Sequence, residues 1–540
     1  MYIKISKTGG AKLENRVYFD CDLCLGKYAY KHPLQKWKTE EILKEMDRVG
    51  IAGSFAYHGL AKHYSPEYGN RLLLDELKKS DRLYGCWVLL PDGCGDFPDV
   101  DTFIGQMKEN DIRLAKMFPN KHFYAFDEDT IGKQLTGLEK AGIPLLIDWT
   151  EISYNDLNAV LMCHPGLNVI IQGASWGQER YLYSLMSKYP NTYSDFTSFQ
   201  SNENIEFLCE KFGAHRFVFA TNMPFKSPGA HRALIDYARI SDEEKDLIAY
   251  KNIMRLTGIK PKHVKLPDGD FLMTEAALGK PISIPVFDSH THLIEDGGTH
   301  GTGRPILKSD IDNMVKAYDA IGIDKMTITA WLTIFADYEG GNQITLNAVR
   351  KYPDKVLGYA GIDPNYSEDV GADAYKWHVK YGLKGLKPFY NLSYIRYTDQ
   401  RYEKWWQLAQ EKHLFSLADP GGYNHGQYMQ DIDELAKKYP NVSFFMDHGG
   451  RSFEVAEDYS KVALLNPNVY LQLTYTSVPF GMVEYLSKKI GPEKFMFGTD
   501  APMRDPRQQL GWVVYADIPL EEKKMILAEN MQRVVDRCLI

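Results

Sequence analysis

The sequence repeats itself once, and this repeat constrains the fold more than any other feature. Five segments of the first half return in the same order in the second half: 20–24 as 288–292, 112–118 as 383–389, 144–148 as 414–419, 168–171 as 441–444, and 217–224 as 495–502. The offset between the partners grows along the chain, from 268 residues at the first segment to 278 at the last. Small loop insertions between two copies of one fold produce such a gradual drift, whereas chance similarity would scatter.

Each copy alternates short β-rich runs with amphipathic helical stretches. Residues 51–55, 83–90 and 143–147 are typical of strands, while 39–49 and 202–212 are typical of helices. Such alternation over roughly 250 residues per copy predicts an α/β fold of two tandem (β/α)8 TIM barrels. A doubly wound open sheet would want a glycine-rich phosphate loop after its first strand, and neither copy has one.

The predicted domains are a first barrel at 1–258 and a second at 284–540. The residues between them, 259–283, contain Lys-Pro-Lys and Leu-Pro-Asp-Gly-Asp pieces typical of a linker, and 271–277 could form a short extra element. The two copies are expected to act as a pseudo-dimer within the chain, and a homo-oligomer is a further possibility.

Composition narrows the class of partner. The net charge of −8 leaves no basic excess to neutralise phosphates, which argues against a nucleic-acid or anionic-membrane partner. No apolar signal core and no bilayer-spanning apolar run is present, and seven cysteines without a secretion signal suit reduced thiols. We therefore expect a cytoplasmic protein that acts on a small molecule.

Polar residues that suit a metal follow several strands of the second copy. His290 and His292 end its first strand, and residues two apart in a strand project to the same side. Asp447-His448-Gly-Gly and Gly-Thr-Asp500-Ala-Pro follow two later strands. Since barrel enzymes gather such groups at the C-terminal face of the barrel, the sequence predicts a site for zinc or a similar divalent ion there.

These motifs resemble the amidohydrolase-2 family of the amidohydrolase superfamily, which includes hydrolases, lactonases, hydratases and decarboxylases. The resemblance covers the whole second copy and, more weakly, the first. It implies that His290 and His292 are metal ligands from strand 1. It also implies that Asp500 is the strand-8 ligand and handles a proton, and that His448 is the acid/base or orienting residue. The implied metal is zinc first, with manganese as an alternative.

One position departs from the family pattern. Where the family ends its fifth strand with a histidine ligand, this chain has Asp419. Asp419 could ligate the metal through oxygen, which would admit manganese or magnesium beside zinc, or it could support a ligand without touching the metal. His425 is a second possible replacement. The first copy also carries an aspartate here, Asp148.

Three further residues are candidates for substrate binding. Lys387 ends strand 4, where binuclear members of the superfamily bridge two metals with a carboxylated lysine. It could instead bind a substrate carboxylate or form a structural salt bridge, and Lys116 at the same place in the first copy favours the structural role. Arg451 could clamp a carboxylate with its planar fork, and Trp331 could wall the pocket.

The first copy carries other residues at the positions of the candidate metal ligands and acid/base residues of the second copy. By sequence alignment the replacements are Asp22 for His290, Cys24 for His292, Ser175 for His448 and Asn222 for Asp500. Serine and asparagine offer no proton carrier, and no second Cys-x-x-Cys pair accompanies Cys24 to form a structural zinc site. We expect this copy to be catalytically silent.

The favoured function is a metal-dependent hydrolase that acts on a small cyclic ester, amide or related carboxylic acid through a metal-activated water, with Asp500 or His448 moving the proton. The alternative is a non-oxidative decarboxylase or hydratase of a small aromatic or unsaturated carboxylic acid on the same site. The third is a non-catalytic binding protein, against which the intact set of His290, His292, His448 and Asp500 argues.

Overall fold

The computed structural model describes the chain except for residues 1, 6–10, 15, 30–33, 176, 199–200 and 261–268. The chain divides into two compact units, one of Met1–Gln200 with Asn204–Leu278 and the other of Ser201–Glu203 with Gly279–Ile540. The middle of the predicted linker, 261–268, lies outside the described residues. Within that predicted linker, helix α12 (Phe271–Ala277) belongs to the first unit.

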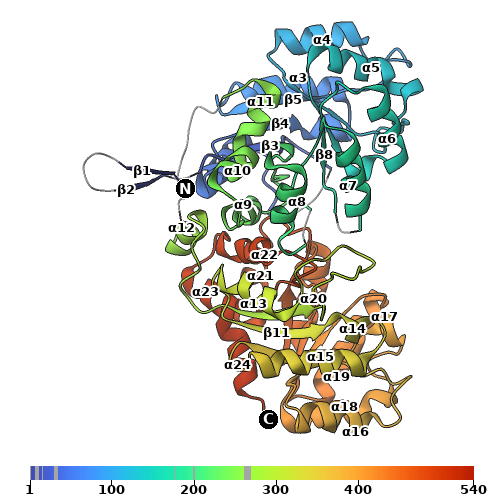
Figure 1. Cartoon of the computed structure of the whole chain (residues 1–540), viewed down its shortest axis with the longest axis vertical. Helices are drawn as coiled ribbons and strands as arrows, with labels where there is room; N and C mark the ends of the chain where they lie inside the picture. Colours follow the sequence, from blue (N-terminus) through green and yellow to red (C-terminus); the bar gives the residue numbers. More distant parts are fainter. Residues whose placement is uncertain are drawn as a thin grey trace. The chain divides into compact units, whose positions relative to one another are not determined.

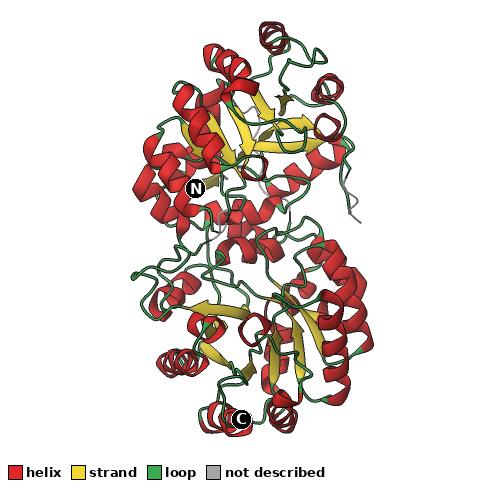
Figure 2. Ribbon diagram, turned by 90° about the vertical axis from the view of Figure 1, so that its right-hand side faces the viewer, coloured by secondary structure: helices red, strands yellow, loops and turns green. Residues whose placement is uncertain are grey.

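The second unit is a barrel of parallel strands surrounded by helices (Figures 1 and 2). Eight strands of its described part pair in chain order: β10 (Phe287–Leu293), β11 (Lys325–Ala330), β12 (Val356–Ala360), β13 (Gly385–Leu386), β14 (Phe415–Ala418), β15 (Ser443–Met446), β16 (Val469–Leu473) and β17 (Phe495–Phe497). The ring closes where Thr291 bridges Ala501 and the Asp500 N–H donates to the His290 carbonyl at 2.8 Å. The longer outer helices are α13 (Ile311–Asp319), α15 (Tyr338–Lys351), α18 (Glu403–Lys412), α19 (His425–Lys438), α20 (Phe453–Leu465), α21 (Met482–Ile490) and α22 (Pro506–Val514).

The first unit repeats this architecture. Seven parallel strands of its described part form the barrel sheet: β3 (Phe19–Leu25), β4 (Gly53–His58), β5 (Leu83–Val88), β6 (Leu114–Met117), β7 (Leu145–Asp148), β8 (Val169–Gln172) and β9 (Thr192–Ser194). β1 (Tyr2–Ile5) and β2 (Ala11–Glu14) pair with each other in a separate antiparallel sheet. Residues 217–223 take the place of an eighth, because Val218 N donates to Ser194 O and Cys21 N donates to Phe219 O, both at 3.0 Å. The longer helices are α1 (Thr39–Val49), α3 (Pro66–Leu77), α4 (Val100–Glu109), α5 (Glu128–Ala141), α6 (Tyr154–Cys163), α7 (Glu179–Lys188), α8 (Asn204–Phe212) and α9 (Pro228–Asp236). The prediction of two tandem (β/α)8 barrels is confirmed.

Helix α1 shows how the local sequence builds these elements. Ile42, Met46 and Val49 recur at helical spacing and are all buried, so one face of the helix packs on the barrel. Glu40 and Glu41 lie in the first turn, where acidic groups suit the helix dipole. The helix ends at Gly50, whose φ of 77° is left-handed. None of the described helices has both the length and the apolar character needed to cross a bilayer.

An aspartate on the first strand fastens each barrel to its last strand. In the second unit, Asp288 accepts hydrogen bonds from Thr499 N at 3.0 Å and from Tyr318 Oη at 2.7 Å. In the first unit, Asp20 accepts one from Thr221 N at 3.0 Å. The register of the first strand shifts just after each aspartate, so the repeat extends to individual hydrogen bonds. We call this contact the Asp–Thr clasp.

Candidate metal centre

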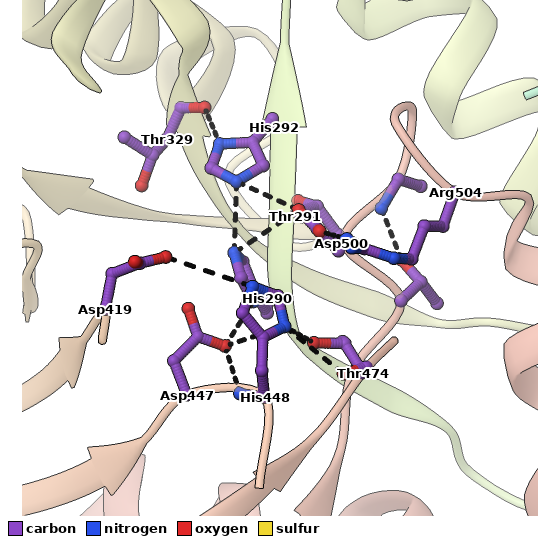
Figure 3. A network of polar contacts seen from close by, with 12 residues as sticks. His290, Thr291, His292, Thr329, Asp419, Asp447, His448, Thr474, Asp500 and Arg504 are labelled. Atoms are coloured by element: carbon purple, nitrogen blue, oxygen red, sulfur yellow. Dashed lines mark hydrogen bonds and ion pairs between the residues drawn. The ribbon is translucent and has the colours of Figure 1, made fainter. Parts of the chain in front are cut away.

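Three side chains converge at the C-terminal end of the second barrel (Figure 3). His290 and His292 both lie on β10, and Asp500 follows β17 at a left-handed φ of 56°. The Nε2 atoms of the two histidines are 3.0 Å apart. Asp500 Oδ1 lies 3.2 Å from His292 Nε2 and 3.6 Å from His290 Nε2. The structure therefore brings together the predicted ligands of strands 1 and 8.

The Nδ1 atoms of both histidines are held by oxygen atoms outside the trio. His292 Nδ1 lies 3.1 Å from the Thr329 carbonyl, which can only accept, so Nδ1 carries the proton. His290 Nδ1 lies 3.1 Å from Asp447 Oδ1 and carries its proton for the same reason. Burial lowers the pKa of His292 to about 3 and, more strongly, the pKa of His290. Both rings are therefore neutral, and each presents a lone pair on Nε2.

This arrangement fits a divalent metal. Two Nε2 lone pairs and one carboxylate oxygen face one another, and Asp500 Oδ1 is buried without a hydrogen-bond partner in the described part of the chain. Uncompensated acceptors at such distances repel one another, whereas a cation among them would satisfy all three. Histidine rings fixed at Nδ1 by a carbonyl and a carboxylate are typical of metal ligands.

Asp419 lies in a neighbouring group rather than among these three atoms. It belongs with Asp447 and His448 to a second trio whose ligand atoms lie within 4.8 Å of one another. Asp419 Oδ2 is 3.9 Å from His448 Nε2. Burial raises the pKa of Asp419 to about 6, and the neighbouring Asp447 adds to the increase, while Lys387 opposes it. Asp419 thus faces the predicted acid/base residue.

The ring of His448 is held in a fixed orientation by a hydrogen bond from its Nδ1 atom. It directly follows Asp447 after β15 at a φ of 55°, and its Nδ1 lies 2.7 Å from Thr474 Oγ1. Because the Thr474 hydroxyl donates to Gln472 Oε1 at 3.1 Å, His448 Nδ1 is the donor to Thr474. Burial lowers the pKa of His448 to about 4, so the ring is neutral. Its Nε2 therefore carries a lone pair that can accept a proton.

Lys387 directly follows β13 and forms a buried ion pair. Its Nζ lies 3.1 Å from Asp447 Oδ2 and 3.5 Å from His290 Nε2. Burial by itself raises the pKa of Asp447, but the N–H that His290 donates and the charge of Lys387 outweigh it and hold that pKa well below its usual range. Asp447 thus connects Lys387 to His290, one of the two histidines that could bind a metal. No role was predicted for Asp447 from the sequence, although it stands next to His448.

Trp331 is the substrate-binding candidate that lines a cavity. This cavity of about 720 Å³ lies beside the ends of β10 and β11, which carry His292 and Thr329. Its apolar walls are Leu293, Ile294, Ala330, Trp331, Leu332, Phe335 and Ile344, and its polar lining is Glu295, Asp296, Thr302, Gly303 and Arg304. Arg304 was not predicted from the sequence, because it lies in the loop after β10 and does not directly follow a strand.

Two other predicted site residues, Arg451 and His425, lie outside the trio of His290, His292 and Asp500, which we call the metal-type trio. Arg451 is in the turn after His448, where its N–H donates to the His448 carbonyl at 3.1 Å. His425 begins helix α19 and pairs with Asp458 at 3.1 Å. The trio of His290, His292 and Asp500 includes neither of them.

Arg504 is a further residue at the site that sequence analysis missed. Its Nη1 forms an ion pair with Asp500 Oδ2, and its Nε donates to Thr476 Oγ1 at 3.2 Å (Figure 3). A basic residue four positions after the strand-8 residue also occurs in the first copy, as Lys226. That repeat is the signal that could have found it.

The strand register corrects one predicted replacement in the first unit. β7 pairs Asp148 with Gln172, whereas β14 pairs Ala418, the residue before Asp419, with Met446. Gln172 therefore occupies the position of Asp447, and Gly173 occupies the position of His448. Gly173 and His448 both have a positive φ. The prediction of Ser175 was wrong. It relied on a repeated Asn-Val pair that begins four residues before Gln172 but six residues before Asp447.

In the first unit, the position of His290 is occupied by Asp22, which forms an internal ion pair with Lys116. Lys116 Nζ lies 2.5 Å from Asp22 Oδ1 and 2.8 Å from Gln172 Oε1. Gln172 Nε2 donates to Asp22 Oδ2 at 2.7 Å. Burial raises the pKa of the Cys24 thiol to about 12, which keeps it protonated. No trio of metal-ligand side chains occurs in the described part of this unit.

Comparisons with known proteins agree with this architecture. The family model described as "Amidohydrolase" matches residues 67–259 and 287–537, which lie in the two units. No curated protein matches the sequence.

Solved structures that resemble the chain include three that each cover about one barrel. A 5-carboxyvanillate decarboxylase from Novosphingobium aromaticivorans, complexed with manganese, has 13% identity and a TM-score of 0.39, covering 47% of this chain and 96% of its own. A probable 2-pyrone-4,6-dicarboxylic acid hydrolase from Acinetobacter baumannii has 14% identity and a TM-score of 0.38, covering 46% and 99%. A 2,6-dihydroxybenzoate decarboxylase from Rhizobium has 13% identity and a TM-score of 0.36, covering 47% and 98%. Since the family model matches most of the sequence across both units, the chain belongs to the amidohydrolase family, as a tandem duplicate.

Proposed function

We propose that the second barrel is a metal-dependent hydrolase that acts on a small cyclic ester, amide or related carboxylic acid. The observation that carries this proposal is the convergence of His290 Nε2, His292 Nε2 and Asp500 Oδ1, three buried acceptor atoms with no proton among them. These residues would hold the ion, and zinc suits two imidazoles and one carboxylate, with manganese as the alternative. When bound, such a metal supplies Lewis-acid chemistry, polarising a carbonyl and lowering the pKa of water.

His448 is the proton acceptor in this proposal. Its Nδ1–H is committed to Thr474, so Nε2 is the only nitrogen of the ring that can take a proton. Asp447 lies 3.6 Å from His448 Nδ1, where its negative charge would stabilise the protonated ring. Asp500 is the second group that can carry a proton at this end of the barrel.

The cavity beside β10 and β11 supports a small substrate with an apolar body. Leu293, Trp331 and Phe335 are among its walls, and Arg304 is the cation in its lining. A substrate carboxylate paired with Arg304 would leave its apolar part against these walls and its reacting group toward His292.

The same cavity favours decarboxylation as a second candidate. Mostly apolar walls withdraw water from a bound carboxylate, and the resulting loss of solvation favours release of carbon dioxide. His448, after taking a proton from solvent at Nε2, would donate it to the carbon left behind when carbon dioxide departs. Product analysis separates the two candidates, because only decarboxylation releases carbon dioxide.

Metal analysis of the purified protein tests the proposal. We expect about one zinc or manganese per chain, either as purified or after metal addition, because among the described residues the trio of His290, His292 and Asp500 occurs once, in the second unit. The His292→Ala variant should lose this metal. Cys24→Ala is the matched control, because Cys24 and His292 share one backbone position, each N–H donating to the carbonyl after the strand-8 residue.

The activity screen should use lactones, amides and aromatic carboxylic acids, with chelated enzyme as the blank. Turnover that disappears on chelation and returns with zinc or manganese supports the proposal. A protein that holds no metal after addition of either ion contradicts it, and so does a His292→Ala variant that retains full metal content.

A further inference from the structure

The carboxylate of Asp500 has two different neighbours on its two oxygens. Oδ1 faces the Nε2 atoms of His290 and His292, whereas Oδ2 forms an ion pair with Arg504 Nη1. Asp500 and Arg504 are both buried, with side-chain exposures of 1% and 11%. A cation bound at Oδ1 and the guanidinium at Oδ2 would therefore be like charges sharing one carboxylate, with little water to screen them.

Three further contacts hold Arg504 in this position. Its Nε donates to Thr476 Oγ1 at 3.2 Å, and its backbone N–H donates to the Asp500 carbonyl at 3.2 Å. The guanidinium also lies 5.0 Å from the centre of the Tyr475 ring. The guanidinium is thus fixed against Oδ2 by groups from the loop after β16, and Figure 3 shows it reaching Asp500 on the side opposite the histidines.

The first copy supplies an internal comparison. Lys226 occupies the place of Arg504, four residues after Asn222, which stands for Asp500. Lys226 Nζ donates instead to Ser198 Oγ at 2.7 Å and to Thr197 O at 3.0 Å. The pairing of the basic residue with the strand-8 side chain thus accompanies the metal-type trio and is not a general property of this barrel.

We propose that Arg504 is a positioning residue that competes electrostatically with the metal for Asp500. It holds the carboxylate so that Oδ1 alone faces the histidines, and its positive charge lowers the affinity of the site for a divalent cation. The inference rests on the proposed function, because it assumes that His290, His292 and Asp500 hold the metal. Its consequence is that the site binds metal more weakly than its three protein ligands alone would allow.

Titration of zinc and of manganese into the chelated full-length protein, followed by calorimetry, tests this inference. Arg504→Met should lower the dissociation constant at least tenfold, because a like charge beside the metal is removed. Arg504→Lys, which keeps the charge, should stay within about threefold of the unsubstituted protein. Lys226→Met is the matched control from the first unit and should leave the dissociation constant unchanged.

A second comparison separates charge competition from a merely structural role. In an Asp500→Asn background, Arg504→Met should strengthen metal binding less than it does beside the intact carboxylate, because the competition for that carboxylate is gone and only the direct repulsion of the metal remains. Arg504→Gln provides a second neutral variant should Arg504→Met fold poorly, with the far-ultraviolet spectrum and the melting temperature as checks.

The outcomes distinguish this inference from the proposed function. Unchanged or weaker metal binding by folded Arg504→Met and Arg504→Gln, in a protein that does bind metal, overturns the role of Arg504 alone. Failure of both the unsubstituted protein and these variants to bind either metal overturns both proposals. Binding that appears only in the Arg504 variants supports the competition and shows its full strength.

Discussion

Asp447 links two groups whose positions matter to the proposed site. One of its oxygens accepts the His290 Nδ1 proton at 3.1 Å, and the other pairs with Lys387 Nζ at 3.1 Å. Asp447 is completely buried, so neither contact is shared with solvent. The residue therefore fixes the ring that would bind the metal and also neutralises a buried cation.

Asp447→Asn should accordingly affect both metal binding and stability. We expect metal affinity to fall by roughly 10- to 100-fold, because His290 loses the carboxylate that orients it. The variant should also lose about 3–5 kcal/mol of unfolding free energy, because Lys387 is left buried without its counter-ion. Calorimetric metal titration and urea unfolding measure the two effects.

A double variant separates them. Asp447→Asn with Lys387→Met removes the uncompensated charge, so most of the stability should return while metal affinity stays low. Recovery of metal affinity in the double variant would mean that Asp447 acts only through Lys387 and not through His290.

Among single residues, those that could be predicted from the sequence lie in polar motifs at the ends of apolar strands. His290, His292, His448 and Asp500 follow apolar strands in motifs that repeat along the chain. The contact of Arg504 with Asp500 depends on side-chain direction, and that of Asp447 with His290 joins residues 157 positions apart. The pairing of Asp447 with His290 has no local pattern, whereas the position of Arg504 is marked only by the basic residue that both copies carry four positions after the strand-8 residue. Asp419 shows the same limit, because strand position alone did not reveal that it faces His448.

Among the elements, η4 (Tyr375–Lys380) and α18 are joined by a buried histidine. His378 accepts a hydrogen bond from Trp405 Nε1 at 2.7 Å and donates from Nδ1 to the Leu383 carbonyl. Burial lowers the pKa of His378 to about 4. The ring is therefore neutral, and one imidazole satisfies a donor on one helix and an acceptor in the loop before β13.

This histidine should make the stability of the second unit depend on pH. Its pKa is about 4 in the folded chain and roughly 6.5 when unfolded, so between these values the unfolded chain binds more protons. The unfolding free energy should therefore be complete above about pH 6.5 and should fall as pH drops toward 4, by up to about 3 kcal/mol from this group.

His378→Gln isolates that contribution, because glutamine can both donate and accept but does not titrate. Urea unfolding at pH 7.5 and pH 4.5 should show a smaller pH-dependent loss in the variant than in the unsubstituted protein. Equal losses in the two proteins would assign the acid sensitivity to other groups.

Elements with a strong periodic pattern were predicted well, and weak ones were not. The helix predicted at 39–49 is α1, and the strands predicted at 51–55 and 143–147 overlap β4 and β7. β13 has only two residues, and residues 217–223 close the first barrel without forming a described strand. Barrel closure defines these segments through long-range pairing, which a short sequence window does not contain.

For the whole molecule, the contrast between the two units lies in what neutralises the barrel lysine. Lys387 pairs with Asp447, whereas Lys116 pairs with Asp22 at the position of His290. Both lysines are buried, so each needs its counter-ion. The first unit thus places fixed internal charges where the second presents ligand atoms.

Asp22→Ala should therefore destabilise the first unit without changing the metal content of the chain. The expected cost is about 3–5 kcal/mol, because Lys116 keeps only a neutral partner, Gln172. Asp22→Ala combined with Lys116→Met should recover most of that loss. Thermal unfolding and metal analysis check the two parts, and a fall in metal content with Asp22→Ala would show that the first unit takes part in binding.

The Asp–Thr clasp bears on how such a chain can evolve. Asp20 with Thr221 and Asp288 with Thr499 make the same hydrogen bonds in both units, although the residues two and four positions further along the first strand differ completely. Ring closure and chemistry thus depend on separate residues of the same strand, so mutations can remove a reactive centre from a duplicated gene product and leave a foldable barrel. Substitutions at the strand ends of either copy can therefore change its chemistry while the ring stays closed.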